Sequence, residues 1–248
     1  MGKIASFFAS PKHQFTSAVI LAGGIGSRFG SEDGTKQNVM VGGVPALVRS
    51  CLPFDRCGKV DEIIIVARED EMETVRGYVS EYGLSKVTKV VSGGATRRES
   101  SYNGSLAVSD KCKYIAIHDA ARCLVTEKII SDTLDAAYKY GAAAAAERVV
   151  DTVKIATPDG FIKKTADRNF VWLVKTPQAF KFHIYETAAE YAKRDGFEAT
   201  DDCSMAERLG FSVKLVDCGR ENIKLTTRDD LSLAEYILQK RDGKGETV

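Results

Sequence analysis

The chain has 248 residues, and its 35 basic side chains nearly balance its 34 acidic ones, which gives a formal net charge of +1. This balance argues against a nucleic-acid-binding protein, because such proteins usually carry a clustered basic face. No apolar run approaches the roughly 18 residues that a membrane span needs. Six scattered cysteines without a CxxC pair argue against a disulfide framework and against a closely spaced zinc site, so we expect free thiols in the reducing cytoplasm.

The N-terminal segment does not resemble the rest of the chain. Its apolar stretch, IASFFA at residues 4–9, is too short for the core of a signal peptide. We therefore expect residues 1–15 to form a leader outside the core, residues 16–242 to form one domain, and residues 243–248 to form a tail.

Strand and helix patterns alternate through the first 140 residues. Short apolar runs predict buried strands at 17–22, 61–67, 86–92 and 113–119. Amphipathic patterns predict helices at 45–57, 70–82, 96–108 and 126–140. This alternation is typical of an α/β domain of the Rossmann-like kind, with a mostly parallel twisted sheet flanked by helices. Ligands of such sheets bind beyond the carboxyl ends of the strands, where three polar segments fall: 23–30, 92–100 and 118–122.

The pattern changes after Gly141. Alternating residues around 149–155, a Pro158–Gly160 turn and a second strand-like run predict a β-hairpin that projects from the sheet, and we place this β-arm at 142–172. Five alanines at 142–146 favour a helix intrinsically, which leaves the start of the arm open. The last predicted elements are helices at 181–194 and 202–209, a strand at 212–218 and a helix at 227–240.

The first polar segment is a glycine-rich loop. Glycines at 23, 24, 26 and 30 let backbone N–H groups approach phosphate oxygens closely. The spacing does not match the dinucleotide fingerprint, because the third glycine comes one position late, and no Gly-Lys-Ser/Thr follows as in a Walker loop. Arg28 and Lys36 suit a triphosphate, since a planar guanidinium bridges oxygens and a flexible ammonium follows charge. The alternative is an ordinary turn with two solvated cations.

The other polar segments supply further candidates. Thr96 can cap the helix after Gly93 and Gly94, and Ser100 lies where a hydroxyl could read a base edge; Arg97 and Arg98 fit either a phosphate site or the surface. Asp119 ends a buried strand, where a carboxylate suits Mg²⁺, which takes one or two carboxylates plus substrate phosphates.

Three more side chains near these segments have competing interpretations. Arg122 could bind a second phosphate, and His118 is better interpreted as a packed residue than as a base. Lys224, just before the last helix, can reach the same edge of the sheet or lie on the surface.

In this order, the segments resemble the 2-C-methyl-D-erythritol 4-phosphate cytidylyltransferases of the non-mevalonate isoprenoid pathway. The resemblance runs from about Ser17 to Leu238. It rests on the motifs GxGxR…KQ, GGxxRxxS, HDAAR, DRN…TPQxF, TDDxS and NIKxT, which are specific in combination.

The resemblance implies an enzyme that transfers CMP from CTP to a sugar-alcohol phosphate with Mg²⁺ held by Asp119. Catalytic neutralisation of the triphosphate falls to Arg28, Lys36 and Lys224. CTP is bound by Ala22, Gly23, Gly24, Gly26, Gly94 and Ser100. The acceptor is surrounded by Arg122, Thr152, Arg168 and Thr200. The resemblance also implies a homodimer in which the β-arm embraces the second subunit and supplies Thr152 and Arg168 across the interface.

Four positions depart from the family pattern: Thr35, Asn38, Ala95 and Cys123. They affect the loop around Lys36 and the ribose contact, but they leave the charged residues intact. A ribitol 5-phosphate cytidylyltransferase shares the chemistry and most motifs, although HDAAR and TDDCS favour the methylerythritol substrate. A catalytically silent nucleotide-binding protein on the same fold is the alternative from another class, and a dinucleotide-dependent oxidoreductase ranks behind both.

Overall fold

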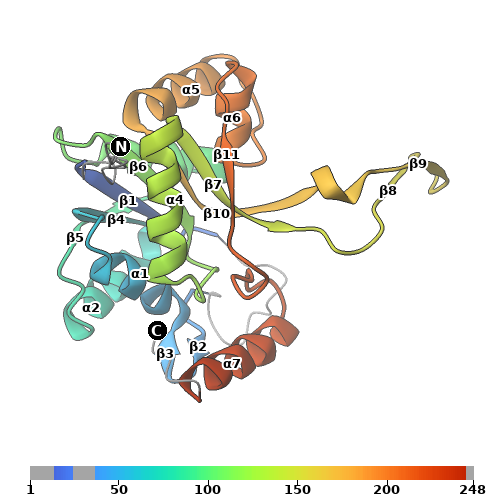
Figure 1. Ribbon diagram of the computed structural model, residues 1–248. Coiled ribbons are helices and arrows are strands. Elements are labelled where there is room, and N and C mark those ends of the chain that lie inside the picture. The colour runs from blue at the N-terminus through green and yellow to red at the C-terminus, as the bar shows by residue number, and fades with distance from the viewer. Residues whose placement is uncertain (1–13, 25–36, 244–248) are drawn as a thin grey trace, which may run out of the picture.

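A mixed central sheet forms the middle of the computed structural model (Figure 1). The structure describes residues 14–24 and 37–243, and within these ranges seven strands form this sheet in the order β11-β7-β10-β6-β1-β4-β5. In chain order the strands are β1 (Thr16–Leu21), β4 (Glu62–Ala67), β5 (Val87–Ser92), β6 (Tyr114–Asp119), β7 (Ala142–Arg148), β10 (Trp172–Lys181) and β11 (Lys214–Asp217). The predicted mostly parallel sheet is confirmed.

Strand β10 runs against its neighbours. It pairs antiparallel with β6 on one side and with β7 on the other, whereas β1 pairs parallel with β4 and with β6. The first residues of β10 therefore lie at the edge of the sheet where β6 ends. Thr176 of β10 accepts a hydrogen bond from the backbone N–H of Asp119 at 3.0 Å, so this reversed strand contributes to the carboxyl edge.

Helices cover both faces of the sheet, as Figure 1 shows. The helices are α1 (Ala46–Arg56), α2 (Met72–Glu81), α3 (Arg97–Leu106), α4 (Glu127–Tyr140), α5 (Phe182–Arg194), α6 (Asp202–Arg208) and α7 (Arg228–Asp242). Buried side chains of α1, α2 and α4 share one core with the sheet, and those of α5 and α6 share the other. Strand β1 alternates between the two cores, with Ala18 and Ile20 in the first and Val19 in the second, as the period of two requires.

The five alanines form a strand although their intrinsic preference is helical. Ala142–Ala146 begin β7, are at most 1% exposed, and lie between β10 and β11. Tertiary packing overrides the weak helix propensity here, because small side chains fit between the sheet and the helices on both faces. These residues belong to the central sheet, so the β-arm is shorter at its base than the predicted 142–172.

The arm itself leaves the sheet at the ends of β7 and β10 and projects away from the domain (Figure 1). It contains the short strands β8 (Lys154–Ala156) and β9 (Ile162–Thr165), which pair antiparallel, and the 3₁₀ turn Arg168–Phe170. The predicted hairpin is confirmed. Its apolar side chains Phe161 and Phe170 are 71% and 83% exposed, respectively.

A smaller core lies under the C-terminal helix. The strands β2 (Met40–Val41) and β3 (Val44–Pro45) pair with each other, and Val41 packs with Leu124, Ala234 and Leu238. This cluster joins α7 to the segment after Asp119, which fixes the part of the chain that carries Lys224. The six cysteines are free, and among the described residues no helix has the length and apolar character needed to cross a bilayer.

Helix α3 approaches the sheet through a glycine, which gives a test of the packing. A Cβ on Gly104 would overlap with Val19 and lie 2.7 Å from Cγ2 of Val66. We expect Gly104→Ala to lower the free energy of unfolding by about 1–3 kcal/mol, because the interior cannot yield to an added methyl group without strain. Urea denaturation followed by circular dichroism measures the change.

Gly77, in the middle of α2, is the matched control, since nothing lies within 4 Å of the Cβ that alanine would add there. Gly77→Ala should raise the free energy of unfolding by about 0.5–1 kcal/mol through helix propensity. Equal stabilisation by both substitutions would contradict the close approach of α3 to the sheet.

Candidate active site

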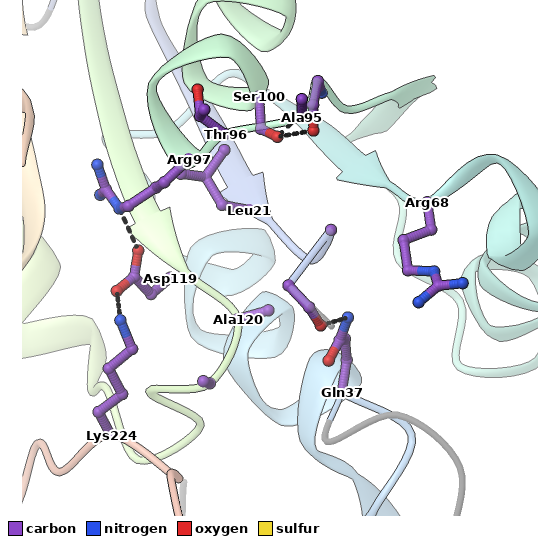
Figure 2. A pocket seen from close by; sticks show the side chains of 14 residues that line it. Leu21, Gln37, Arg68, Ala95, Thr96, Arg97, Ser100, Asp119, Ala120 and Lys224 are labelled. Atoms are coloured by element: carbon purple, nitrogen blue, oxygen red, sulfur yellow. Dashed lines mark hydrogen bonds and ion pairs between the residues drawn. The ribbon is translucent and has the colours of Figure 1, made fainter. Parts of the chain in front are cut away.

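A cavity of about 550 Å³ opens at the carboxyl edge of the sheet, beyond β1, β4 and β6 (Figure 2). It is lined by Leu21, Gly23, Gly24, Gln37, Arg68, Gly94, Ala95, Thr96, Arg97, Ser100, Asp119, Ala120, Ala121 and Lys224. These residues come from six separate stretches of the chain. The three polar segments that the sequence placed at strand ends all contribute to it.

One wall of the cavity is the first turn of α3 and the loop before it. The hydroxyl of Ser100 accepts a hydrogen bond from the backbone N–H of Gly94 at 3.1 Å. A Cβ on Gly93 would lie 2.8 Å from this hydroxyl, and one on Gly94 would overlap the side chain of Glu99. The glycines are needed because the loop passes directly over the helix. Thr96 caps the helix, as predicted, by accepting from Glu99 N–H at 3.1 Å.

The end of β1 forms the facing wall. The backbone N–H of Ala22 donates to the carbonyl of Val66 at 2.7 Å, which continues the pairing with β4 by one residue. The buried amide of Gln37 donates to the carbonyl oxygens of Ala22 and, at 3.0 Å, of Gly24. Gln37 thereby ties its own segment to the segment that follows β1. Gly23 and Gly24 line the cavity, whereas Ala22 lies just behind them.

The carboxylate of Asp119 lies between two cations on the floor of the cavity (Figure 2). One oxygen, Oδ2, is 2.7 Å from Nζ of Lys224, and the other, Oδ1, is 3.1 Å from Nε of Arg97. Burial opposes ionisation of Asp119, but the charges of Arg97 and Lys224 outweigh it and hold the pKa of this carboxyl well below its usual value. Asp119 is therefore an anion whenever the domain is folded near neutral pH.

The backbone around Asp119 is fixed by its buried neighbour His118. Burial lowers the pKa of His118 to about 3, so the ring is neutral. Its Nε2 lies 3.3 Å from the carbonyl oxygen of Arg122, which can only accept, and its Nδ1 lies 3.0 Å from the hydroxyl of Thr176. The ring thus donates to one segment and accepts from the other. The prediction that His118 is packed and hydrogen-bonded is confirmed.

The donor set suits Mg²⁺ more than a metal held by protein groups alone. Among the described residues, no group of three or more histidine, cysteine, aspartate or glutamate side chains could enclose an ion. A lone carboxylate at the floor of an open cavity fits a hard cation that takes its other ligands from water and phosphates. The residues present therefore fit the magnesium that the sequence predicted at Asp119.

Six of the predicted residues meet in this cavity: Gly23, Gly24, Gly94, Ser100, Asp119 and Lys224. Arg122 does not line it, and its Nη1 instead donates to the carbonyl oxygen of Asn222 at 3.0 Å. Arg28, Lys36 and Gly26 lie outside the residues that the structure describes. The predictions for these three stay predictions.

The other acceptor-binding candidates lie away from the cavity within this one chain. Thr152 and Arg168 are exposed on the β-arm, where Arg168 Nη1 donates to the carbonyl oxygen of Val150 at 2.7 Å. Thr200 is exposed just before α6 and does not line the cavity either. This chain by itself therefore does not bring the predicted acceptor-binding set together.

Two arginines line the cavity although the sequence left the position of one open and did not single out the other. Arg97, for which the sequence allowed a phosphate site or the surface, points into the cavity, whereas its neighbour Arg98 donates to the carbonyl oxygen of Ala192 on α5 at 3.0 Å. Arg68, which the sequence did not single out, follows β4 and pairs with Asp70 at 2.6 Å. Arg68 directly follows a predicted strand, and residues at the carboxyl ends of parallel strands line the site, so its position in the sequence could have identified it.

Comparison with known proteins agrees with this arrangement. Residues 16–240 match the family model described as 2-C-methyl-D-erythritol 4-phosphate cytidylyltransferase. A protein of that name from Syntrophus aciditrophicus is 42% identical over 228 residues, which cover 92% of this chain and 97% of the relative. One from Caldanaerobacter subterraneus is 42% identical over 225 residues, which cover 90% and 99%.

A solved structure with a similar fold has a name that agrees with this family. The crystal structure of a 4-diphosphocytidyl-2C-methyl-D-erythritol synthase from Anaerococcus prevotii superposes with a TM-score of 0.84 at 29% identity, over 93% of this chain and 99% of that one. The sequence match, the fold and the contents of the cavity all point the same way. The chain belongs to the 2-C-methyl-D-erythritol 4-phosphate cytidylyltransferase family.

Proposed function

We propose that the cavity binds CTP beside 2-C-methyl-D-erythritol 4-phosphate and that the protein transfers CMP from the first to the second, releasing pyrophosphate. The family assignment supports the reaction. The observation that carries it in this chain is the meeting of Lys224, Arg97 and Asp119 on the floor of one cavity whose walls are backbone and a serine hydroxyl. A site for a charged nucleotide needs both features: a cation such as Lys224 and a carboxylate such as Asp119 that can hold a metal for the phosphates, and polar groups for the base.

The reaction is an in-line displacement. An oxygen of the acceptor phosphate attacks the α-phosphorus of CTP, the bond from that phosphorus to the bridging oxygen breaks, and pyrophosphate leaves with the electron pair. A phosphate monoester is already anionic near neutral pH, so no general base is required. This agrees with the neutral, buried His118. The barrier comes from bringing two polyanions together, and Lys224, with Arg28 and Lys36, would neutralise the growing charge.

Asp119 would hold Mg²⁺, which supplies further charge neutralisation on the phosphates. Lys224 now occupies Oδ2 of this carboxylate at 2.7 Å. Phosphates in the cavity would offer Lys224 another anionic partner, which would free the Asp119 carboxylate to hold the metal. Lys224 and Mg²⁺ would then together neutralise the negative charge of the triphosphate and of Asp119.

The walls of the cavity would select the base. We assign cytosine to the side formed by Gly94 and Ser100, with the backbone of Gly23 and Gly24 opposite. The hydroxyl of Ser100 lies 3.1 Å from Gly94 N and 3.4 Å from Gly94 O, so it can both accept and donate at this wall. Such a group recognises the exocyclic edge of a pyrimidine by hydrogen bonding.

A homodimer would complete the acceptor site, and we place the enzyme in the cytoplasm, where its free thiols stay reduced. The exposed aromatic side chains Phe161 and Phe170 on the arm support an interface there, because isolated arms rarely leave large apolar side chains in water without a partner. Thr152 and Arg168 would then reach the cavity of the partner subunit, to meet Arg122 and Thr200 around the acceptor.

Release of pyrophosphate tests this function. With CTP and Mg²⁺ we expect pyrophosphate when 2-C-methyl-D-erythritol 4-phosphate is added, and about tenfold less with ribitol 5-phosphate. Its chain is one carbon longer and lacks the methyl branch, so a site matched to the first acceptor should disfavour it by about 1.4 kcal/mol. ATP in place of CTP should give none.

Each other outcome has a definite meaning. Faster turnover of ribitol 5-phosphate would assign the other acceptor. No pyrophosphate with either acceptor, from protein that binds CTP in calorimetry, would make this chain a silent nucleotide-binding member of its family.

A further inference from the structure

We propose that Arg97, anchored by the buried carboxylate of Asp202, is a positioning residue that fixes the orientation of Asp119 for metal binding. The inference deepens the proposed function and rests on it, since it concerns the carboxylate that we expect to hold Mg²⁺. It assigns a task to the second aspartate of the TDD motif, which does not line the cavity. Arg97 itself would act through Asp119 rather than on the phosphates.

Arg97 bridges two carboxylates with two different nitrogens. Its Nε donates to Oδ1 of Asp119 at 3.1 Å, and its Nη1 donates to Oδ2 of Asp202 at 2.8 Å. A guanidinium is planar and rigid, so fixing one nitrogen on Asp202 fixes the direction in which the other meets Asp119. A lysine could not hold both contacts in this geometry.

Asp202 is a suitable anchor because it is buried and hydrogen-bonded on several sides. Its side chain is fully buried, and its Oδ1 accepts from the hydroxyl of Ser101 at 2.6 Å. Ser101 in turn lies 2.6 Å from the hydroxyl of Tyr185 on α5. The backbone N–H of Asp202 donates to Oε1 of Gln178 on β10 at 3.0 Å. The anchor is thus held by α3, α5 and β10 together.

The charges explain why an arginine lies between Asp119 and Asp202. A buried carboxylate without a cationic partner is strongly unfavourable, and Arg97 supplies that partner. Arg97 is still 29% exposed and lines the cavity, so its charge also reaches Asp119. The contact uses Oδ1 and leaves Oδ2, now paired with Lys224, as the oxygen available to a metal. Hydrogen-bond partners that orient a metal ligand in this way commonly tune metal affinity.

The competing explanation is that Arg97 binds the triphosphate directly. The two differ in one measurable respect. A phosphate ligand contributes to CTP binding whether or not metal is present, whereas a residue that orients Asp119 contributes only when a metal accompanies the nucleotide. Binding of CTP with and without a divalent cation therefore separates them.

The test is the double substitution Arg97→Gln with Asp202→Asn in the full chain. It removes one positive and one negative charge, so the net charge of the site is unchanged and no buried carboxylate is left unpaired. Calorimetry measures CTP binding in EDTA, and water-proton relaxation measures binding of the Mn²⁺–CTP complex without acceptor. We expect metal-free CTP affinity to stay within about twofold of the wild type and Mn²⁺–CTP affinity to fall by about tenfold or more.

Two further variants keep the test decisive. Arg98→Gln alters the neighbouring arginine, which contacts α5, and should leave both affinities unchanged. Arg97→Lys preserves the cation that Asp202 needs, so it reports on the bridge even if the double variant does not fold, and it should weaken Mn²⁺–CTP binding in the same direction.

The inference is overturned if Mn²⁺–CTP affinity is preserved, or if the loss is as large in EDTA as with metal. Asp119→Asn in the same assay distinguishes an error in the metal site from an error in the role of Arg97. Unchanged Mn²⁺–CTP affinity in that variant would mean that the metal site itself is wrongly assigned. Weakened binding in Asp119→Asn with wild-type binding in the double variant would reject the role of Arg97 alone.

Discussion

Asp119→Asn is expected to lower the turnover number for CMP transfer by about 10³-fold or more, which corresponds to roughly 4 kcal/mol of lost transition-state stabilisation. Asparagine keeps the size of the side chain but loses the charge that attracts Mg²⁺, and it leaves Lys224 without its anionic partner at 2.7 Å. The pyrophosphate assay at saturating CTP and acceptor measures the effect.

Asp217→Asn is the matched control, because Asp217 also ends a strand of the same sheet but lies on the surface, 3.7 Å from Arg148. It should turn over at the wild-type rate. Circular dichroism melting curves should show both variants folded. Activity of Asp119→Asn within tenfold of the wild type would remove the metal ligand from the mechanism.

Lys224→Met is expected to lower turnover by about 10²–10³-fold, the usual effect of losing one preorganised charge contact with a developing anion. Methionine retains much of the apolar stem, so packing is preserved while the ammonium is lost. The variant should also fold well, because Arg97 still pairs with Asp119 at 3.1 Å. The turnover number comes from the same pyrophosphate assay.

Lys240 offers the comparison for Lys224, since it is another partly exposed lysine with a carboxylate partner, Glu221, at 3.1 Å, and it does not line the cavity. Lys240→Met should leave turnover unchanged. A Lys224→Met enzyme as fast as Lys240→Met would show that the lysine at the floor of the cavity does not act on the substrate.

Much of the fold could be predicted because the apolar periods are strong. The runs that became β4 and β6 are buried along their whole length, and β1 is buried except for its last residue, Leu21. Helix α1 between β1 and β4 buries a clear apolar face. The main exception is Ala142–Ala146, where side chains too small to show a period are held as a strand by neighbours on both sides. Local sequence contains no signal for those neighbours.

The candidate site was partly predictable for a similar reason. Residues at the carboxyl ends of parallel strands must meet, so Gly23, Gly94 and Asp119 could be placed together. The partner of Arg97 could not be found this way, because Asp202 lies 105 residues further along and is buried behind the site. The orientation of Arg122 toward Asn222 likewise depends on a segment that no local pattern connects to it.

The reversed direction of β10 has a consequence for tolerated changes in chain length. Trp172–Val174 pair with β7 at the root of the arm, and Thr176, two residues later, holds the amide of Asp119. Since neighbouring strand residues face opposite sides, deleting or inserting one residue here would turn the Thr176 hydroxyl away from the cavity floor. Only the tip of the hairpin, between β8 and β9, can lengthen or shorten without moving Thr152, Arg168 or Thr176, whereas this short stretch itself must keep its length.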